Sequence, residues 1–99
     1  MKNQNDRLNW NDEDAYWRNN YRSRPYASQN DYEYFQPGYR YGFDSANRYG
    51  NREWRDVETE LSSGWNTYEH RGKSTWEQVK GAVRDAWDRV TGHHHVGTR

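Results

Sequence analysis

The pattern of large apolar side chains in residues 54–90 occurs twice, with a period of 22 residues. In each copy the apolar residues stand at offsets of 0, 3, 7, 11 and 14 from the first one. On a helix that turns by about 100° per residue these offsets fall within an arc of about 80°, so each copy predicts a helix with one narrow apolar stripe. The two stripes consist of Trp54, Val57, Leu61, Trp65 and Tyr68, and of Trp76, Val79, Val83, Trp87 and Val90.

Turn and capping residues predict where these helices end. The first helix is expected to begin near Asn51 and to end by Arg71, because Gly72 can adopt the left-handed conformation that terminates many helices. Ser74 and Glu77 have the spacing of a capping box, with Ser74 as the N-cap of the second helix. About three residues then separate the two helices, and such a short connection joins antiparallel neighbours.

The predicted fold is therefore all-α, with an antiparallel Trp-rich hairpin over residues 51–91 that ends at Gly92. The tryptophans expected to face each other are Trp65 with Trp76 at the turn and Trp54 with Trp87 at the open end.

Before the hairpin, the sequence predicts a flexible tail at residues 1–10 and a helix at residues 11–23. Asn11 or Asp12 can cap this helix, and Pro25 should end it, because proline disfavours helical geometry in the residue before it.

A Tyr-rich irregular segment is expected at residues 25–50, packed over the hairpin. Pro37-Gly38 indicates a turn, and residues 44–49 a short helical turn, although the alternation of this segment also fits short strands. Residues 11–91 would then form one small domain, followed by a His-containing tail at residues 92–99.

The composition predicts a thin, aromatic-rich core. Only 30% of the residues are hydrophobic, yet 17% are aromatic, and 15 basic residues balance 15 acidic ones. The two stripes alone bury too little apolar surface to offset the ordering of two helices. More surface must come from the N-terminal part of the chain or from a second copy of it. The further residues assigned to packing are Trp10, Trp17, Tyr39, Tyr41 and Phe43.

Several classes of protein are disfavoured by what the chain lacks. It has no cysteine, and therefore no disulfide or thiolate metal site. No apolar run approaches the length of a membrane span, and residues 1–10 lack the apolar core of a secretory signal. A cytoplasmic location without membrane contact is therefore expected.

Residues 74–91, Ser-Thr-Trp-Glu-Gln-Val-Lys-Gly-Ala-Val-Arg-Asp-Ala-Trp-Asp-Arg-Val-Thr, resemble the core motif of the CsbD-like bacterial general stress proteins. The shared features are the Trp-x-Gln-x-Lys-Gly start, a basic-acidic pair before the second Trp, and the closing apolar residue and Thr. The tail that follows departs from the second half that those proteins usually carry. From Tyr39 onward the chain also resembles small hydrophilic bacterial proteins of unknown function. Both resemblances imply a helical, stress-associated protein without known catalysis.

Side chains that could perform enzyme chemistry have simpler structural interpretations. The histidines at 93–95 are the only clustered metal-ligand candidates, and a solvated tail accounts for them. His70 is interpreted as a favourable cation at a helix end. The acidic pairs Asp85 with Asp88 and Glu58 with Glu60 are interpreted as solvated or paired with arginine. With neither a phosphate-binding glycine loop nor an activated serine, we expect no enzyme activity, cofactor, metal or small-molecule substrate.

Interleaved arginine and aromatic residues permit a different function, the binding of single-stranded nucleic acid. Arginine can pair with phosphates while aromatic rings stack on bases. A net charge of zero opposes this reading, because phosphate contacts normally require a basic face. The candidate contacts are Arg18, Arg22, Arg24, Arg40, Tyr39 and Tyr41.

The sequence thus favours a small non-enzymatic structural or interaction protein, stress-associated and self-associating. A self-contact that does not close would extend into a filament. Single-stranded nucleic-acid binding is the alternative.

Overall fold

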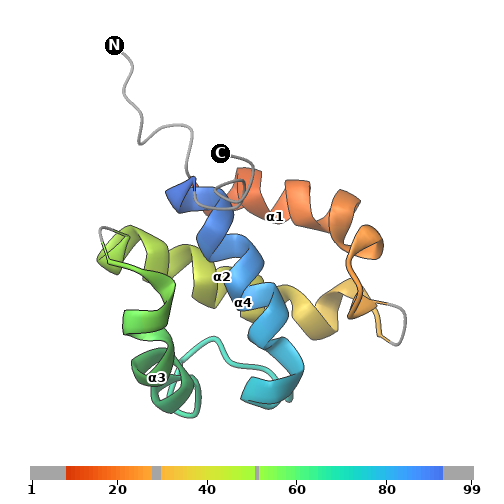
Figure 1. Ribbon diagram of the computed structural model, residues 1–99. Coiled ribbons are helices and arrows are strands. Elements are labelled where there is room, and N and C mark those ends of the chain that lie inside the picture. Colours follow the sequence, from red (N-terminus) through yellow and green to blue (C-terminus); the bar gives the residue numbers. More distant parts are fainter. Residues whose placement is uncertain (1–8, 28–29, 51, 93–99) are drawn as a thin grey trace.

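The computed structural model describes residues 9–27, 30–50 and 52–92. These ranges form the α-helices α1 (Trp10–Asn20), α2 (Tyr32–Tyr49), α3 (Trp54–Trp65) and α4 (Trp76–Thr91), with a 3-10 helix, η2 (Tyr21–Ser23), directly after α1 (Figure 1). No strand occurs within them. The prediction of an all-α fold is confirmed.

The helices begin at a regular interval along the chain. Their first residues, Trp10, Tyr32, Trp54 and Trp76, are each 22 residues apart. The N-caps that precede them have the same interval and are Asn9, Asp31, Glu53 and Thr75. The 22-residue period that the sequence shows over residues 54–90 therefore extends over the four helices, and each helix with its following connection is one repeat unit.

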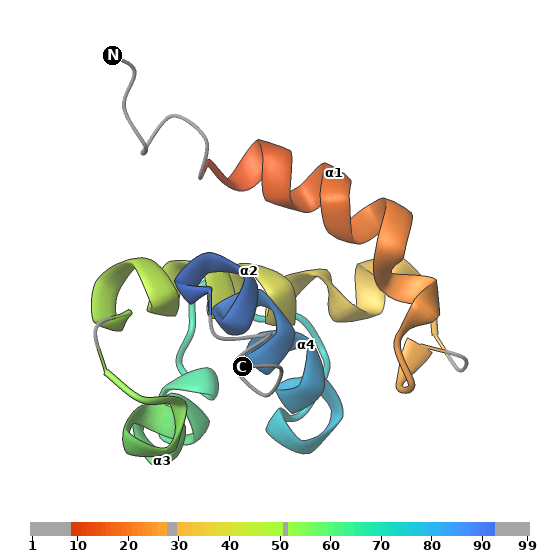
Figure 2. The ribbon, with the colours of Figure 1, turned by 45° about the horizontal axis from the view of Figure 1, so that its top comes forward.

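The four units are arranged as two similar halves, α1–α2 and α3–α4. Helix α2 lies in the middle, with α1 on one side and α3 on the other, and α4 passes across it (Figure 2). The most extensive contact between helices is that of α2 with α4. The halves repeat in detail: the ring centroids of Trp10 and Phe43 are 5.8 Å apart, as are those of Trp54 and Trp87, 44 residues later in the chain.

Small residues allow α2 and α4 to approach closely where they cross. A Cβ atom on Gly38 would lie 2.9 Å from Cβ of Val79, and one on Gly42 would lie 2.9 Å from Cβ of Ala86. Without side chains at these two positions, the backbone of α2 can lie directly against α4. The crossing therefore depends on Gly38 and Gly42.

Helix α2 corrects the prediction for residues 25–50, which were expected to be irregular. Residues 32–49 are helical, and Pro37 lies inside the helix rather than in a turn. Proline removes one helical hydrogen bond, but burial of one whole face against α1 and α4 outweighs that cost. The buried residues of this face include Tyr32, Phe35, Tyr39, Phe43 and Ala46, at the same offsets as the stripes of α3 and α4.

The same helix supplies the apolar surface that the hairpin lacks. Buried residues of α1 and α2 form an aromatic cluster that Ala82 and Ala86 of α4 complete. A second cluster joins α3 and α4 and includes Tyr41 and Ala46 of α2. Both clusters are built within one chain, so this core does not need a second copy to close it.

Helix α3 ends earlier than predicted, at Trp65 instead of Arg71. The indole Nε1 of Trp65 donates a 2.8 Å hydrogen bond to the carbonyl of Ser74, and Tyr68 leaves the helix to contact α2. The connection to α4 therefore covers residues 66–75. Gly72 does not end α3, and the expected three-residue turn is wrong.

The tryptophan pairs of the hairpin are only partly as predicted. Trp54 and Trp87 are neighbours, as expected. Trp76, however, stacks on Trp54 at a centroid distance of 6.5 Å, and Trp65 contacts the residues just before α4 through its bond to Ser74.

The cap of α4 lies one residue later than predicted. Thr75 Oγ1 accepts from the Gln78 amide at 3.3 Å, and Gln78 Oε1 accepts from the Thr75 amide at 2.9 Å, which completes a capping box. Ser74 is buried and its hydroxyl donates to the carbonyl of Tyr34 at 3.0 Å, so it cannot cap the helix. At the other end, Gly92 has a φ of 81° and ends α4 as predicted.

Helix α1 also begins earlier than predicted. Asn9 is its N-cap, because the Asn9 side chain accepts from the Asp12 amide at 2.9 Å. Trp10 is therefore the first residue of α1 and not part of a tail. Residues 1–8 and the histidines at 93–95 lie outside the described residues.

Candidate functional site

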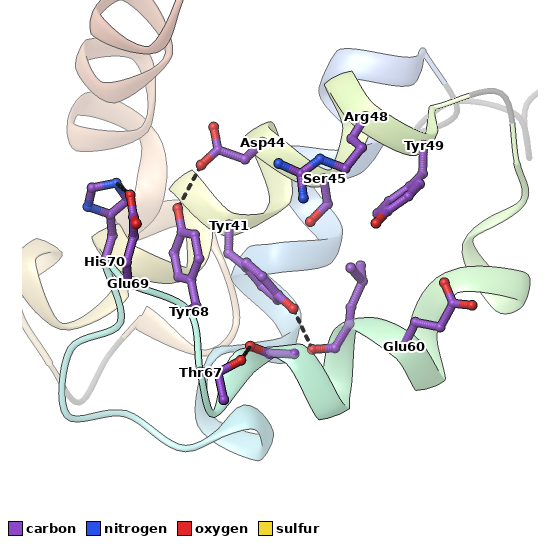
Figure 3. Close-up of a pocket in the computed structure, with 12 residues that line it drawn as sticks. Tyr41, Asp44, Ser45, Arg48, Tyr49, Glu60, Thr67, Tyr68, Glu69 and His70 are labelled. Carbon is purple, nitrogen blue, oxygen red and sulfur yellow. Dashed lines mark hydrogen bonds and ion pairs between the residues drawn. The ribbon is translucent and has the colours of Figure 1, made fainter.

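Two pockets occupy places that correspond in the repeat, and each lies between a helix of one half and a helix of the other. The α2–α3 pocket has a volume of about 470 Å³ and lies between α2, α3 and residues 67–70 (Figure 3). The α1–α4 pocket has about 320 Å³ and lies between α1, α4 and residues 23–24. All eight residues that line the α1–α4 pocket have a counterpart 44 residues away that lines the α2–α3 pocket. Tyr16, Trp17, Asn20, Ser23, Arg24, Asp85, Asp88 and Arg89 correspond to Glu60, Leu61, Gly64, Thr67, Tyr68, Tyr41, Asp44 and Ser45.

Ion pairs of the chain itself line the α1–α4 pocket. Arg24 donates to the carboxylate of Asp85 through Nε at 2.8 Å and Nη2 at 3.2 Å. Burial disfavours the charge of Arg24, but Asp85 outweighs this and the pKa of Arg24 is raised. These contacts bind the segment after α1 to α4.

A second ion pair at the α1–α4 pocket joins α4 to α1. The guanidinium of Arg89 lies 3.5 Å from the ring centroid of Tyr16, and its Nε donates to Glu13 at 2.9 Å. Glu13 is only 3% exposed. In the repeat, Glu13 of α1 occupies the position at which α2, α3 and α4 carry the apolar residues Phe35, Val57 and Val79. At this position of α1 the buried residue is therefore the ion-pair partner of an arginine.

Tyrosine hydroxyls hold the α2–α3 pocket in shape. Tyr41 donates to the carbonyl of Leu61 at 2.7 Å, and Tyr68 donates to the carboxylate of Asp44 at 2.7 Å (Figure 3). Burial raises the pKa of Tyr41 to about 12. Burial and the bond to Asp44 also raise the pKa of Tyr68. Both phenols therefore stay protonated at neutral pH and act as donors between α2 and the residues that follow it.

The carboxylates of the α2–α3 pocket are already matched by groups of the chain. Asp44, which accepts from Tyr68, lies 3.8 Å from Nε of Arg40. Glu60 lies 3.3 Å from Nη1 of Arg52, and Glu69 lies 3.1 Å from Nε2 of His70.

Unlike these carboxylates, two polar side chains of the α2–α3 pocket have no ion-pair or hydrogen-bond partner among the described residues. The guanidinium of Arg48 lies 5.9 Å from the ring centroid of its neighbour Tyr49, and Arg48 makes no ion pair within the described part of the chain. Ser45 is only 5% exposed, and its hydroxyl has no hydrogen-bond partner among the described residues.

Further tyrosines join α1 and the segment after it to α2 and α4. The hydroxyls of Tyr26 and Tyr39 lie 2.8 Å apart, and Tyr26 also donates to Asp85. Tyr32 donates to Asp14 at 2.6 Å, and so does Gln36 at 2.8 Å. Burial is the largest cause of the raised pKa of each of these three tyrosines. Burial disfavours ionised Asp14, but the bonds from Tyr32 and Gln36 and the charge of Arg18 outweigh it and lower the pKa of Asp14.

The structure places all ten stripe residues in one cluster between α3 and α4. Trp54, Val57, Leu61, Trp65, Val79, Val83 and Trp87 are buried, and Tyr68, Trp76 and Val90 are partly buried and packed against them. Of the other aromatic residues assigned to packing, Trp17, Tyr39, Tyr41 and Phe43 are buried, and Trp10 is partly buried.

The candidate nucleic-acid contacts are mostly engaged elsewhere. Tyr39 is 0% exposed and Tyr41 is 7% exposed, so neither ring is open to a base. Three of the four candidate arginines lie within ion-pair distance of a carboxylate: Arg18 near Asp14 and Glu33, Arg24 near Asp85, and Arg40 near Asp44. Arg22 is exposed and faces the ring of Tyr21.

Ser45 and Arg89 were not predicted as site residues, and Tyr26 and Arg48 were noted only among the interleaved arginine and aromatic residues. The signal for Ser45 and Arg89 is the repeat: a shift of 44 residues aligns Ser45 with Arg89 and Val57 with Glu13. Asp85, interpreted as solvated or paired with arginine, is bound by Arg24. Within the described residues, no group of three or more His, Cys, Asp or Glu could hold a metal ion.

No family model, curated protein or solved structure matches this chain. The resemblance of residues 74–91 to the CsbD-like proteins therefore stays a prediction. Among the described helices, none is both long and apolar enough to cross a membrane.

Proposed function

We propose that this chain is a small non-enzymatic interaction protein of the cytoplasm, which acts through contacts of its folded surface. One observation carries the proposal: the titratable groups with the most altered pKa are used to join helices. Such groups mark active sites when they face a cleft without a structural partner. Here Tyr26, Tyr32 and Tyr68 each donate to a carboxylate on another segment, so burial in the packed core, together with these contacts, raises their pKa.

A second copy of the chain is the partner that we propose. Exposed charges of both signs carry no ion pair within the described residues, among them Arg22, Arg55 and Lys73, and Asp31 and Glu53. With a net charge of zero, no long-range repulsion keeps copies apart. Self-association would therefore be polar and weakened by salt. A role in stress rests on the resemblance of residues 74–91 alone.

Sedimentation of the purified protein at rising concentrations, in low and in physiological salt, tests this proposal. We expect association in low salt that weakens as salt is added, with an unchanged helical circular dichroism spectrum. A monomer at every concentration would contradict self-association. Added single-stranded DNA tests the alternative, for which we expect no binding tighter than the micromolar range at physiological salt. Tighter binding that falls steeply with salt would favour the nucleic-acid function instead.

A further inference from the structure

The α2–α3 pocket is larger than its counterpart, with about 470 Å³ against about 320 Å³. In the α1–α4 pocket, the side chain of Arg89 occupies the space against Tyr16 and is neutralised by Glu13. The residue that corresponds to Arg89 in the α2–α3 pocket is Ser45, which is too small to fill the same space. The result is a pocket of about 470 Å³, within the usual range for sites that bind small molecules.

The α2–α3 pocket nevertheless contains a guanidinium group, that of Arg48. Figure 3 shows the side chain of Arg48, one helical turn after Ser45, with its guanidinium group turned toward the Ser45 hydroxyl. Arg48 lacks the counter-charge that Arg89 has, because the residue that corresponds to Glu13 is the apolar Val57. The two pockets therefore differ in their arginines: Arg89 of the α1–α4 pocket is paired with Glu13, whereas Arg48 of the α2–α3 pocket makes no ion pair within the described residues.

The remaining charges of the pocket do not compensate Arg48. Each lining carboxylate lies beside a donor or cation of the chain: Asp44 beside Tyr68, Glu60 beside Arg52, and Glu69 beside His70. The Arg48 guanidinium makes no ion pair and the Ser45 hydroxyl has no hydrogen-bond partner within the described residues, so both keep unused hydrogen-bonding capacity. Both can donate to the same anion.

We propose that the α2–α3 pocket binds a small organic carboxylate, held by Arg48 and Ser45. The planar guanidinium matches a carboxylate geometrically, and the hydroxyl adds a third donor. The rings of Tyr41 and Tyr49 and the side chain of Leu61 line the same pocket and favour a flat apolar body on the ligand. A doubly charged phosphate fits less well, because one arginine cannot balance it beside three carboxylates.

This proposal goes beyond the proposed self-association and does not depend on it. Binding is therefore measured at a protein concentration where sedimentation shows a monomer. Benzoate is the probe, and benzamide is its neutral counterpart of the same shape. We expect benzoate to bind with a Kd on the order of 1 mM or below, as detected by calorimetry and by NMR shifts of residues that line the pocket.

Two variants locate the site. Arg48→Gln should weaken benzoate binding at least about tenfold, because it removes a charge-assisted pair. Ser45→Ala should weaken it about threefold, and the matched control Arg55→Gln, at an exposed position of α3, should leave it unchanged. Arg48 is exposed, so its replacement should not change the helical circular dichroism spectrum.

Four results would overturn the proposal. Equal binding of benzoate and benzamide would show that the charge is not recognised. Unchanged binding to Arg48→Gln, or shifts outside the pocket, would place the ligand elsewhere. Tighter binding of inorganic phosphate than of benzoate would show that the site does not select a carboxylate.

Discussion

Gly42 of α2 lies directly against the backbone carbonyl of Val83 in α4, and a Cβ atom at position 42 would overlap that oxygen. This contact fixes how closely α2 and α4 approach, and the crossing of these helices is the most extensive contact between the two halves of the domain. A rigid backbone carbonyl cannot move aside as a flexible side chain can. The relationship therefore leads to the first prediction.

Gly42→Ala should destabilise the fold by roughly 2 kcal/mol or more, because overpacking at this contact outweighs the gain of about 1 kcal/mol that alanine usually brings to a helix. Chemical denaturation followed by circular dichroism measures the change. Asn47→Ala, on the exposed face of the same helix, is the matched control and should be neutral or stabilising. A stabilised Gly42→Ala variant would show that the helices do not cross at this distance.

The two buried tryptophans of the α3–α4 cluster should respond differently to phenylalanine. Nε1 of Trp65 donates to Ser74, whereas Nε1 of Trp87 is buried without a partner within the described residues. Trp65→Phe loses a hydrogen bond and should cost about 1 kcal/mol more than Trp87→Phe. The residue of α2 that corresponds to Trp87 in the repeat is already a phenylalanine, Phe43. Equal costs in denaturation experiments would contradict the assigned bond to Ser74.

Asp85 should be a carboxylate on which the stability of the domain depends, because Arg24 and Tyr26 both donate to it. Asp85→Asn should lower the free energy of unfolding by about 2 kcal/mol, and Tyr26→Phe by about 1 kcal/mol. The control Glu33→Gln removes an exposed carboxylate and should change stability by less than about 0.5 kcal/mol. If Asp85→Asn and Glu33→Gln have the same effect, the contacts of Asp85 do not stabilise the fold.

Alkaline pH should unfold the domain through its buried tyrosines. Burial raises the pKa of Tyr41 from 10.0 to about 12. Since the folded value is the higher one, the protonated phenol stabilises the fold fully below pH 10 and loses this contribution as the pH rises through 12. Tyr41→Phe should therefore show a shallower loss of stability over this range than the wild-type chain. Asn47→Ala should keep the wild-type slope, and an unchanged slope in Tyr41→Phe would contradict the burial of this phenol.

Sequence reasoning recognised the repeat only where the stripe is almost uniformly apolar: it predicted a helix at residues 11–23 without recognising it as a copy, and it missed α2. The stripes of α3 and α4 are made of Trp, Val and Leu, with one Tyr, and stand out by periodicity. In α1, Glu13 occupies an apolar position because Arg89, 76 residues away, neutralises it. In α2, Pro37 and the glycines indicated turns, although packing against α4 makes them helical. Contacts with residues distant in the sequence compensate for these locally unfavourable residues, and such contacts cannot be predicted from a local pattern.

The candidate site was missed for a related reason. Ser45 and Arg48 are ordinary polar residues of an exposed-looking segment, and only the three-dimensional comparison of the two pockets distinguishes them. The 44-residue shift was present in the sequence, but it becomes visible once the starts of all four helices are known.

The central claim is that α2 closes the core within one chain by crossing α4. Isotope-filtered NMR on a mixture of labelled and unlabelled protein tests it most directly. The account predicts nuclear Overhauser contacts between the α protons of Gly42 and the methyl group of Ala86 in the uniformly labelled sample, and none between labelled and unlabelled chains. Contacts between chains at these residues would show that another copy completes the core, and would contradict the account.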